Sequence, residues 1–476
     1  MIDNIKDYLL MNKQKSILFI ILFIYTLFLA WFSFSDTFVW WDESVYVGMG
    51  KYIASGGHLG MWEIFRPPLL PLFYAFLFKL NIPLILLGKI LVIISSVSAL
   101  YLVYLISESI KKGAGIFSCI FLMITPVFFG FSRVPMTDII SIFFALLAIH
   151  FFIKEKLFLT GLFISFVFLL RFPQGLIIVP IGIVYIINSY NKSFKLWFIN
   201  SFIGLSKIFL GFIILVSAYL ISNYILYGNI LKPFILASDA VSLSSSWYDY
   251  GLFYYVKSIY KVTPFLFLSL LFPLFYISKN YISEPRNKKN LLLILIVGLV
   301  VTSYFFIQTH KELRYSLAFI PYLAILSGVS LYFIISLFKN KKFLVIIFIV
   351  YLSYFIFTKV SYLGDDTGYK YNSINDYMST LSGNYISTNP LPAVYGHVHV
   401  LSLFESASSF DTLYSKKLDS LDGIFIKDCD FFCSEKKQTK ICSNDLEKVN
   451  KIIENSKFKK GYEEIIDQCI FSIYNK

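Results

Sequence analysis

The chain has 476 residues, of which 57% are hydrophobic and 19% aromatic, and its formal net charge is +13. An ordinary soluble domain is about 45–50% apolar, so this composition excludes a chain made only of soluble domains. The positive charge does not indicate nucleic-acid binding, because the lysines gather in short segments between apolar runs, where they orient membrane helices.

Apolar runs long enough to cross a bilayer recur along residues 1–360. They predict an all-α polytopic membrane protein with about eleven spans, at 17–34, 84–107, 113–131, 137–153, 157–171, 174–190, 196–226, 262–278, 291–308, 315–337 and 343–360. The run 196–226 is long for one pass, so it either tilts or breaks near Lys207 and Gly211. A shorter run, 69–80, follows two prolines and predicts an interfacial helix.

The first run follows Lys13 and Lys15, as the apolar core of a signal peptide would. It leads into aromatic and acidic residues rather than a small-residue cleavage site, so we interpret it as a retained anchor. With the N-terminus inside, the short basic loops fall in the cytoplasm, as the positive-inside rule requires. The segments 35–83, 133–138, 228–261 and 310–314, the turn around Arg171 and everything after 360 then lie outside.

Residues 361–476 are more polar than the rest and contain stretches typical of strands at 384–388, 393–403, 423–427 and 462–474. We predict a small extracytoplasmic α/β domain here, after a transmembrane catalytic domain at 1–360 whose outer loop is 35–83. Four of the five cysteines lie in this domain: Cys429, Cys433, Cys442 and Cys469. An even number in an oxidising compartment predicts two disulfides, whose pairing stays open, and a zinc site is the alternative.

Acidic side chains stand beside the predicted outer ends of two spans. Asp42 and Glu43 follow the first span in Trp41-Asp42-Glu43-Ser44, and Asp138 begins the span 137–153. Charged groups at a membrane are costly and mark functional sites, and carboxylates suit a general base or a metal ligand. Taken alone, Asp138 is equally explained as a helix N-cap.

Cations lie in the same outer segments: Arg66, Arg133, Arg171, His310, Lys311 and Arg314. Arginine and lysine suit phosphate. Individually, Arg171 and Arg314 could reach the interface as snorkelling side chains, and 310–312 could be an ordinary charged turn. Together, acids and cations on one membrane face predict transfer from a phosphorylated lipid.

Four of these segments resemble motifs of the GT-C glycosyltransferases, which use polyprenyl-phosphate sugars. Residues 41–46, Arg66-Pro67-Pro68-Leu69 and residues 133–138 resemble the first-loop acidic, Lys/Arg-Pro-Pro-Leu and second-loop acidic motifs of the protein O-mannosyltransferase and aminoarabinose transferase branch. His310-Lys311-Glu312-Leu313-Arg314-Tyr315 resembles the His-Lys-Glu-x-Arg-Phe signature of the lipid-linked and GPI mannosyltransferases. The first loop thus resembles one branch and the His-Lys-Glu segment another, which leaves the donor sugar and the acceptor open.

The resemblance implies an inverting glycosyltransferase that moves a sugar from a polyprenyl- or dolichyl-phosphate donor to a glycan, lipid or protein acceptor. Asp42 would be the base, and Glu43 and Asp138 would position the acceptor or a divalent cation (Mg, Mn or Zn) held by Asp42 and Asp138. Arg66, Arg133, Arg171, His310, Lys311 and Arg314 would bind the donor phosphate. The membrane would be the cell membrane, or the endoplasmic reticulum in a eukaryote.

Two other classes of protein fit the composition. A transporter or lipid flippase places its charged groups near the middle of the membrane, on broken helices, whereas here they stand at the ends of the predicted spans. A non-catalytic scaffold would not explain the acids and arginines gathered on the outer side.

Overall fold

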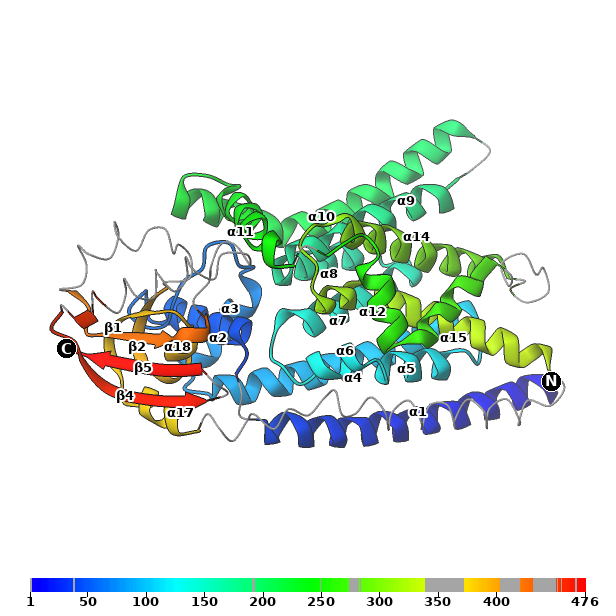
Figure 1. Cartoon of the computed structure of the whole chain (residues 1–476). Helices are drawn as coiled ribbons and strands as arrows, with labels where there is room; N and C mark the ends of the chain where they lie inside the picture. The colour runs from blue at the N-terminus through cyan, green and yellow to red at the C-terminus, as the bar shows by residue number, and fades with distance from the viewer. Residues whose placement is uncertain are drawn as a thin grey trace. The chain divides into compact units, whose positions relative to one another are not determined.

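The computed structural model describes residues 2–36, 39–190, 193–248, 250–273, 282, 284–338, 372–402, 420–430, 451, 453–454, 456–466 and 469–476 (Figure 1). The chain forms two compact units. The first comprises Met1–Ser33, Ile90–Ile230 and Tyr250–Asp365, and the second comprises Phe34–Lys89, Leu231–Asp249 and Asp366–Lys476. The predicted domain boundary at 360 and the predicted span 343–360 lie outside the described residues.

The first unit is helical. Its elements in chain order are α1 (Ile2–Ser35), α4 (Leu84–Ile110), α5 (Gly115–Met123), α6 (Pro126–Phe131), α7 (Thr137–Ile153), α8 (Leu157–Leu170), η1 (Phe172–Ile177), α9 (Ile178–Asn188), α10 (Phe194–Tyr227), α12 (Tyr254–Val262), η2 (Pro264–Leu271), α14 (Pro285–Ile307), η3 (Leu313–Ala318) and α15 (Ile320–Leu337). The last two residues of α1 and the first six of α4 belong to the second unit.

Five helices in the described part of the chain are long and apolar enough to cross a membrane: Gln14–Ser35, Leu84–Ile110, Phe194–Tyr227, Pro285–Ile307 and Ile320–Leu337. The chain is therefore a multi-pass membrane protein, but the count of about eleven spans is not confirmed. The predicted span 113–131 is divided into α5 and α6, and 262–278 begins as the 3₁₀ helix η2. Each of these later elements starts at a proline, which cannot continue a preceding helix.

The long helix α10 runs unbroken through Lys207 and Gly211, so the break allowed there does not occur. Its contact with α8 depends on glycine. A Cβ on Gly161 would lie 1.8 Å from the Ile208 carbonyl oxygen, and one on Gly211 would lie 2.1 Å from that of Phe158. Small residues let two apolar helices approach at backbone distance, as is usual for helices packed within a membrane.

The second unit joins helices from the first loop to a mixed sheet. Its elements are α2 (Trp41–Ala54), α3 (Leu69–Lys79), α11 (Lys232–Tyr248), α17 (Asn372–Ser379), β1 (Ser382–Ser387), α18 (Leu391–Tyr395), β2 (His397–Ser402), β3 (Gly423–Lys427), η9 (Asp428–Asp430), β4 (Lys459–Ile466) and β5 (Cys469–Asn475). The strand order is β2-β1-β3-β5-β4. Strand β1 is parallel to β2 and β3, and β5 is antiparallel to β3 and β4.

The C-terminal residues form a small sheet, as predicted, with two corrections to the expected strands. The stretch 393–403, expected as one strand, begins within the short helix α18, which has prolines at its start, and continues as β2. The stretch 462–474 is the hairpin of β4 and β5. Apolar side chains of Ile386, Leu421, Ile424, Ile426, Ile453 and Phe458 form the core beneath the sheet.

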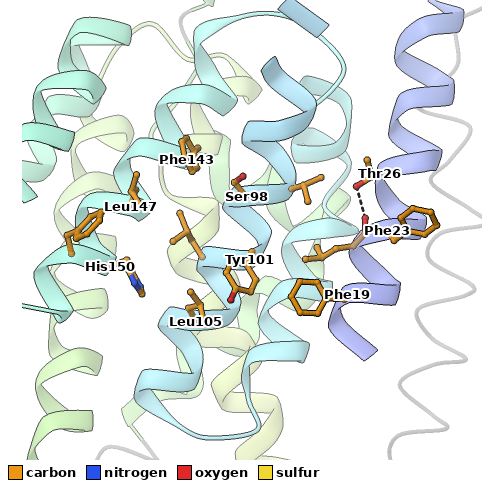
Figure 2. Close-up of a pocket in the computed structure, with 13 residues that line it drawn as sticks. Phe19, Phe23, Thr26, Ser98, Tyr101, Leu105, Phe143, Leu147 and His150 are labelled. Carbon is orange, nitrogen blue, oxygen red and sulfur yellow. Dashed lines mark hydrogen bonds between the residues drawn. The ribbon is translucent and has the colours of Figure 1, made fainter. Parts of the chain in front are cut away.

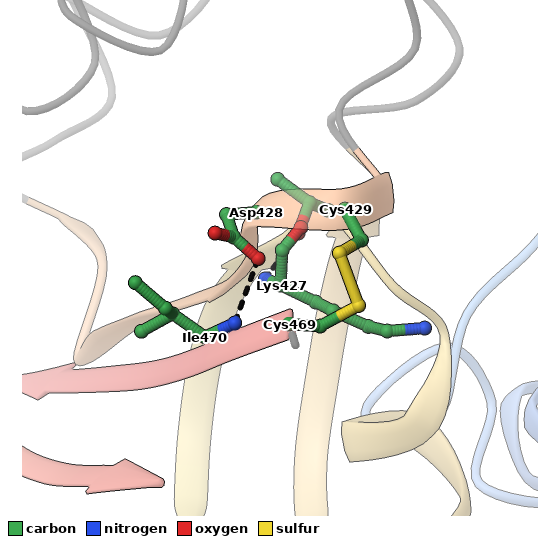
Figure 3. The surroundings of a disulfide bond; sticks show 6 residues. Lys427, Asp428, Cys429, Cys469 and Ile470 are labelled. Carbon is green, nitrogen blue, oxygen red and sulfur yellow. Dashed lines mark hydrogen bonds between the residues drawn. A yellow bond between two sulfur atoms is a disulfide. The ribbon is translucent and has the colours of Figure 1, made fainter. Parts of the chain in front are cut away.

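A disulfide between Cys429 and Cys469 joins η9 to the start of β5 (Figure 3). The two Cα atoms are 5.4 Å apart, within the usual range for a disulfide. Beside it, Asp428 Oδ1 accepts a hydrogen bond of 2.7 Å from the Ile470 backbone N–H. The other two cysteines of the predicted set, Cys433 and Cys442, lie outside the described residues.

Candidate functional site

Asp42 and Glu43 occupy the first turn of α2. The Trp40 backbone N–H, which precedes the helix, donates a hydrogen bond of 3.2 Å to Glu43 Oε2. This is the glutamate half of a capping box, and acidic residues in a first turn also suit the positive end of the helix dipole. The Glu43 side chain is buried, whereas that of Asp42 keeps 13% of its surface exposed.

Asp42 forms an ion pair with Arg66. Arg66 Nη2 lies 2.9 Å from Asp42 Oδ1, and Arg66 Nε lies 2.7 Å from Glu63 Oε2. The guanidinium also lies over the rings of Tyr46 and Phe65, at 5.7 and 5.5 Å from their centroids. The structure therefore brings together the predicted base and the first predicted phosphate-binding cation.

Glu63 was absent from the predicted site residues, although it completes this cluster. The position of Glu63, three residues before Arg66, could have indicated that the two side chains lie close together. Residues 63–66 form a turn, in which the Arg66 N–H donates a hydrogen bond to the Glu63 carbonyl. Burial raises the pKa of Glu63, and the Arg66 charge lowers it. Burial also lowers the pKa of Arg66, but Asp42 and Glu63 raise it well above its ordinary value, so the guanidinium stays charged.

Glu43 differs sharply from its neighbour in the chain. Burial raises its pKa to about 8, against the lowering effects of the Trp40 N–H and of Lys89, and Asp36 raises it further. Its Oε1 has no hydrogen-bond partner among the described residues. The Glu43 carboxyl is thus placed to hold the start of α2, and a direct role in binding the acceptor or a cation stays a prediction.

A second acid–arginine pair lies in the first unit. Asp138 is buried in the first turn of α7, where the residue preceding the helix is Met136, so the explanation of Asp138 as an N-cap is wrong. Its carboxylate forms an ion pair with Arg171, which follows the last turn of α8. The Arg171 guanidinium lies over the Tyr315 ring at 4.9 Å. Arg171 is therefore paired and mostly buried, which is not the arrangement of a snorkelling side chain.

The residues 310–315 converge on one carboxylate, that of Glu312. His310 Nε2 lies 2.9 Å from Glu312 Oε1, Arg314 Nε lies 2.6 Å from Oε2, and the Tyr315 hydroxyl donates to Oε1 at 3.0 Å. Through Tyr315 this cluster reaches Arg171. The predicted residues Asp138, Arg171, His310 and Arg314 are therefore gathered in one region of the first unit.

The remaining two predicted cations have other surroundings. The Lys311 ammonium is buried and donates to the Tyr250 carbonyl at 2.9 Å. The Arg133 guanidinium lies over the rings of Phe32 and Phe129, at 5.8 and 5.6 Å. Their assignment to the donor phosphate stays a prediction, as does the joining of the Asp42 and Asp138 clusters into one site, because these clusters belong to different units.

Gln174 was not predicted from the sequence. It lies in η1, three residues after Arg171, and keeps only 6% of its surface exposed. Neither Gln174 Oε1 nor Nε2 has a hydrogen-bond partner among the described residues. A buried amide without partners is costly, which makes Gln174 a candidate for contact with a bound ligand. In the sequence, Gln174 is a single polar residue in an apolar run, and that pattern does not indicate a ligand contact.

An apolar groove of about 790 Å³ lies within the first unit, and Figure 2 shows the side chains that line it. Helix α1 contributes Phe19, Phe23 and Thr26, and α4 and α7 contribute most of the remainder, among them Ser98, Tyr101, Leu105, Phe143, Leu147 and His150. The Thr26 hydroxyl is satisfied by the Leu22 carbonyl at 2.7 Å. The lining is therefore suited to a hydrocarbon chain rather than to a polar ligand.

The residues as placed do not fit a divalent cation at the predicted ligands. A hard cation needs several oxygen ligands that converge, but Asp42 and Asp138 each face an arginine instead. In the part of the chain that the structure describes, the only close group of three possible ligands is Asp428, Cys429 and Cys469. The two sulfurs of that group are bonded to each other, so they are not thiolate ligands for zinc.

Comparison with known proteins identifies structures with a similar fold. No family model matches the chain, and neither does any curated protein. Among solved structures, the chain is similar to ArnT, the aminoarabinose transferase of Cupriavidus metallidurans, bound to undecaprenyl phosphate, with a TM-score of 0.64 at 12% identity over 95% of this chain and 97% of that one. The apo form of the same protein gives a TM-score of 0.56 at 11% identity over 96% and 97%.

An oligosaccharyltransferase of Archaeoglobus fulgidus, tethered to an acceptor peptide, has a TM-score of 0.53 at 12% identity over 96% of this chain and 74% of that one. Both proteins are GT-C glycosyltransferases. The resemblance found in the sequence is thus confirmed for the fold: this chain has the GT-C fold.

Proposed function

We propose that the protein is an inverting membrane glycosyltransferase that transfers a sugar from a polyprenyl- or dolichyl-phosphate donor. The observation that carries the proposal is the Asp42–Arg66 pair, 2.9 Å apart at the start of α2, on a GT-C fold. A carboxylate and a guanidinium at one place supply a base for the acceptor and a partner for the departing phosphate. The similar ArnT structure holds undecaprenyl phosphate, which supports a lipid donor of this class.

In the proposed reaction, the acceptor hydroxyl oxygen attacks the anomeric carbon of the donor sugar. The bond from that carbon to the phosphate oxygen breaks, and the lipid phosphate leaves with its electron pair. Asp42 takes the proton from the acceptor hydroxyl, and such general-base help contributes about 10²–10⁴ in rate. Attack opposite the leaving group inverts the anomeric configuration.

Arg66 has two roles in this proposal. Without a donor it neutralises Asp42 and Glu63, and it exchanges part of this contact for the phosphate when the donor binds. Charge-assisted hydrogen bonds to a developing phosphate charge are strong in a poorly hydrated site. Release of Asp42 from the ion pair would also raise the basicity of that carboxylate at the moment when it is needed.

The cluster around Arg171 serves the same donor in the proposal. Arg171, His310 and Arg314 would bind the phosphate and the sugar, with Asp138 fixing the Arg171 guanidinium. The orphaned Gln174 amide would bind a sugar hydroxyl, which satisfies its unpaired polar atoms. The groove between α1, α4 and α7 would take part of the isoprenoid chain.

The test is a transfer assay with purified protein in detergent. The protein is given a panel of radiolabelled polyprenyl-phosphate sugars, with a membrane-lipid extract and a peptide mixture as acceptors. The proposal predicts release of polyprenyl phosphate and a labelled acceptor for at least one donor. If no polyprenyl phosphate binds, the glycosyltransferase proposal is wrong and a transporter or flippase becomes the better explanation.

A further inference from the structure

Helix α2 is fixed at its far end by the C-terminal domain. Lys51 lies in the last turn of α2, and its ammonium donates hydrogen bonds to the carbonyl of Val394 and, at 3.3 Å, to that of Gly396. These carbonyls stand at the end of α18, where helical carbonyls lack partners within the helix. A lysine that satisfies such carbonyls also suits the negative end of the helix dipole.

The loop after α2 extends the sheet of the same domain. The Gly60 N–H donates to the Val398 carbonyl at 2.7 Å, and the Val400 N–H donates to the Gly60 carbonyl at 2.7 Å. Gly60 therefore pairs with β2, which is an edge strand of the sheet. Its φ is +78°, and a Cβ there would lie 2.1 Å from the Gly48 carbonyl oxygen, so glycine is required at this position.

Glycines also let α2 approach its neighbours at backbone distance. A Cβ on Gly48 would lie 2.9 Å from the Ala393 Cβ of α18. On Gly50 it would lie 2.4 Å from the Tyr74 Cβ of α3. Helix α2 is thus held between α18 and α3, and segments more than 300 residues apart in the chain form one packed body.

We propose that Lys51 is a positioning residue and that the C-terminal domain is the scaffold that aims Asp42. The proposal rests on the proposed function, because it concerns the direction of the proposed base. Asp42 and Lys51 stand on one stiff helix, roughly 13 Å apart along its axis at 1.5 Å per residue. A helix released at Lys51 is held at only one end and can tilt, which changes the position and direction of the Asp42 carboxylate. A displacement of roughly 1 Å at a reacting group can cost on the order of 10²-fold in rate.

The experiment compares three variants of the full chain. Lys51→Met keeps the apolar length of the side chain but cannot donate, Lys51→Arg keeps a donor, and Lys79→Met is the matched control. Lys79 lies in the last turn of α3, in the same unit, and is exposed. For each variant, kcat and donor KM are measured in the transfer assay, and hydrogen exchange is measured by mass spectrometry for the peptide covering 41–54.

We expect Lys51→Met to lower kcat about tenfold or more, with little change in donor KM, and to speed exchange in 41–54. Lys51→Arg should recover most of the kcat, and Lys79→Met should match the wild type in both readouts. Wild-type kcat and wild-type exchange in Lys51→Met would overturn the proposal. So would an equal loss in Lys79→Met.

If Lys51→Met does not fold, a second variant tests the same proposal. Gly48→Ala removes no charge, but its Cβ would lie 2.7 Å from Met61 Cγ and 2.9 Å from Ala393 Cβ, so it crowds α2 against the following loop and α18. Gly182→Ala, on a helix of the first unit where the Cβ would have room, is its control. Gly48→Ala should lower kcat, and Gly182→Ala should not; equal kcat in the two would overturn the proposal. If the wild type binds no polyprenyl phosphate, the proposed function is wrong, and the exchange measurement alone then decides whether Lys51 holds α2.

Discussion

Arg66 Nη2 lies 2.9 Å from Asp42 Oδ1, and this contact ties the loop after α2 to the first turn of that helix. The same guanidinium binds Glu63, so one cation balances two carboxylates that are mostly shielded from water. Because both acids depend on it, the arginine contributes to the stability of the loop as well as to the proposed chemistry.

Replacement of Arg66 by Met should therefore affect both properties. It leaves Asp42 and Glu63 close together without their cation, which should lower the free energy of unfolding by about 1–3 kcal/mol. Donor affinity should fall as well, since the phosphate loses its partner. Arg66→Lys should recover stability only in part, because an ammonium cannot bind two carboxylates with the geometry of a guanidinium. Thermal unfolding and donor binding measure the two effects, and unchanged donor affinity in Arg66→Met would contradict the assignment.

Replacement of Gln174 should affect stability and activity in different ways. Its amide is buried without hydrogen-bond partners among the described residues, so Gln174→Leu removes an unsatisfied polar group while keeping a similar volume. We expect the melting temperature to stay equal or rise, and the transfer rate to fall because a sugar hydroxyl loses its partner. A variant with wild-type transfer would show that Gln174 does not contact the donor.

Lys51 predicts a pH dependence of stability. Burial lowers its pKa from the ordinary value of 10.5 to about 8. Between these two values the unfolded chain binds more protons at this residue than the folded protein does, so the free energy of unfolding rises with pH there. Lys51→Met cannot titrate. The difference in melting temperature, wild type minus Lys51→Met, should therefore grow from pH 8 to pH 10, and a constant or shrinking difference would contradict the burial of a titrating Lys51.

Hydropathy and composition were enough to predict the long membrane helices, a helix at 69–79 and strands near the C-terminus. Strand β3 was predicted at its observed bounds, because a short apolar stretch begins there at Gly423. Two predicted spans differ from the structure because of proline: Pro126 and Pro264 begin new elements inside runs whose hydropathy alone predicted continuous spans.

The candidate site was predictable as a set of residue types but not as a set of partners. Asp42, Arg66, Asp138 and Arg171 are conspicuous because charge is costly beside a membrane. Their pairing depends on loop geometry, which the spacing of charges does not encode. The contact of Lys51 with the Val394 carbonyl joins residues 343 positions apart, and no local pattern indicates such a contact.

The most direct test of the central claim is the transfer rate of Asp42→Asn beside the wild type. The same polyprenyl-phosphate donor is used for both, and Asp376→Asn, at an exposed position of α17, is the matched control. We predict that Asp42→Asn binds the donor but loses about 10²-fold or more in kcat, and that Asp376→Asn keeps the wild-type rate. A wild-type rate in Asp42→Asn would show that Asp42 is not the base.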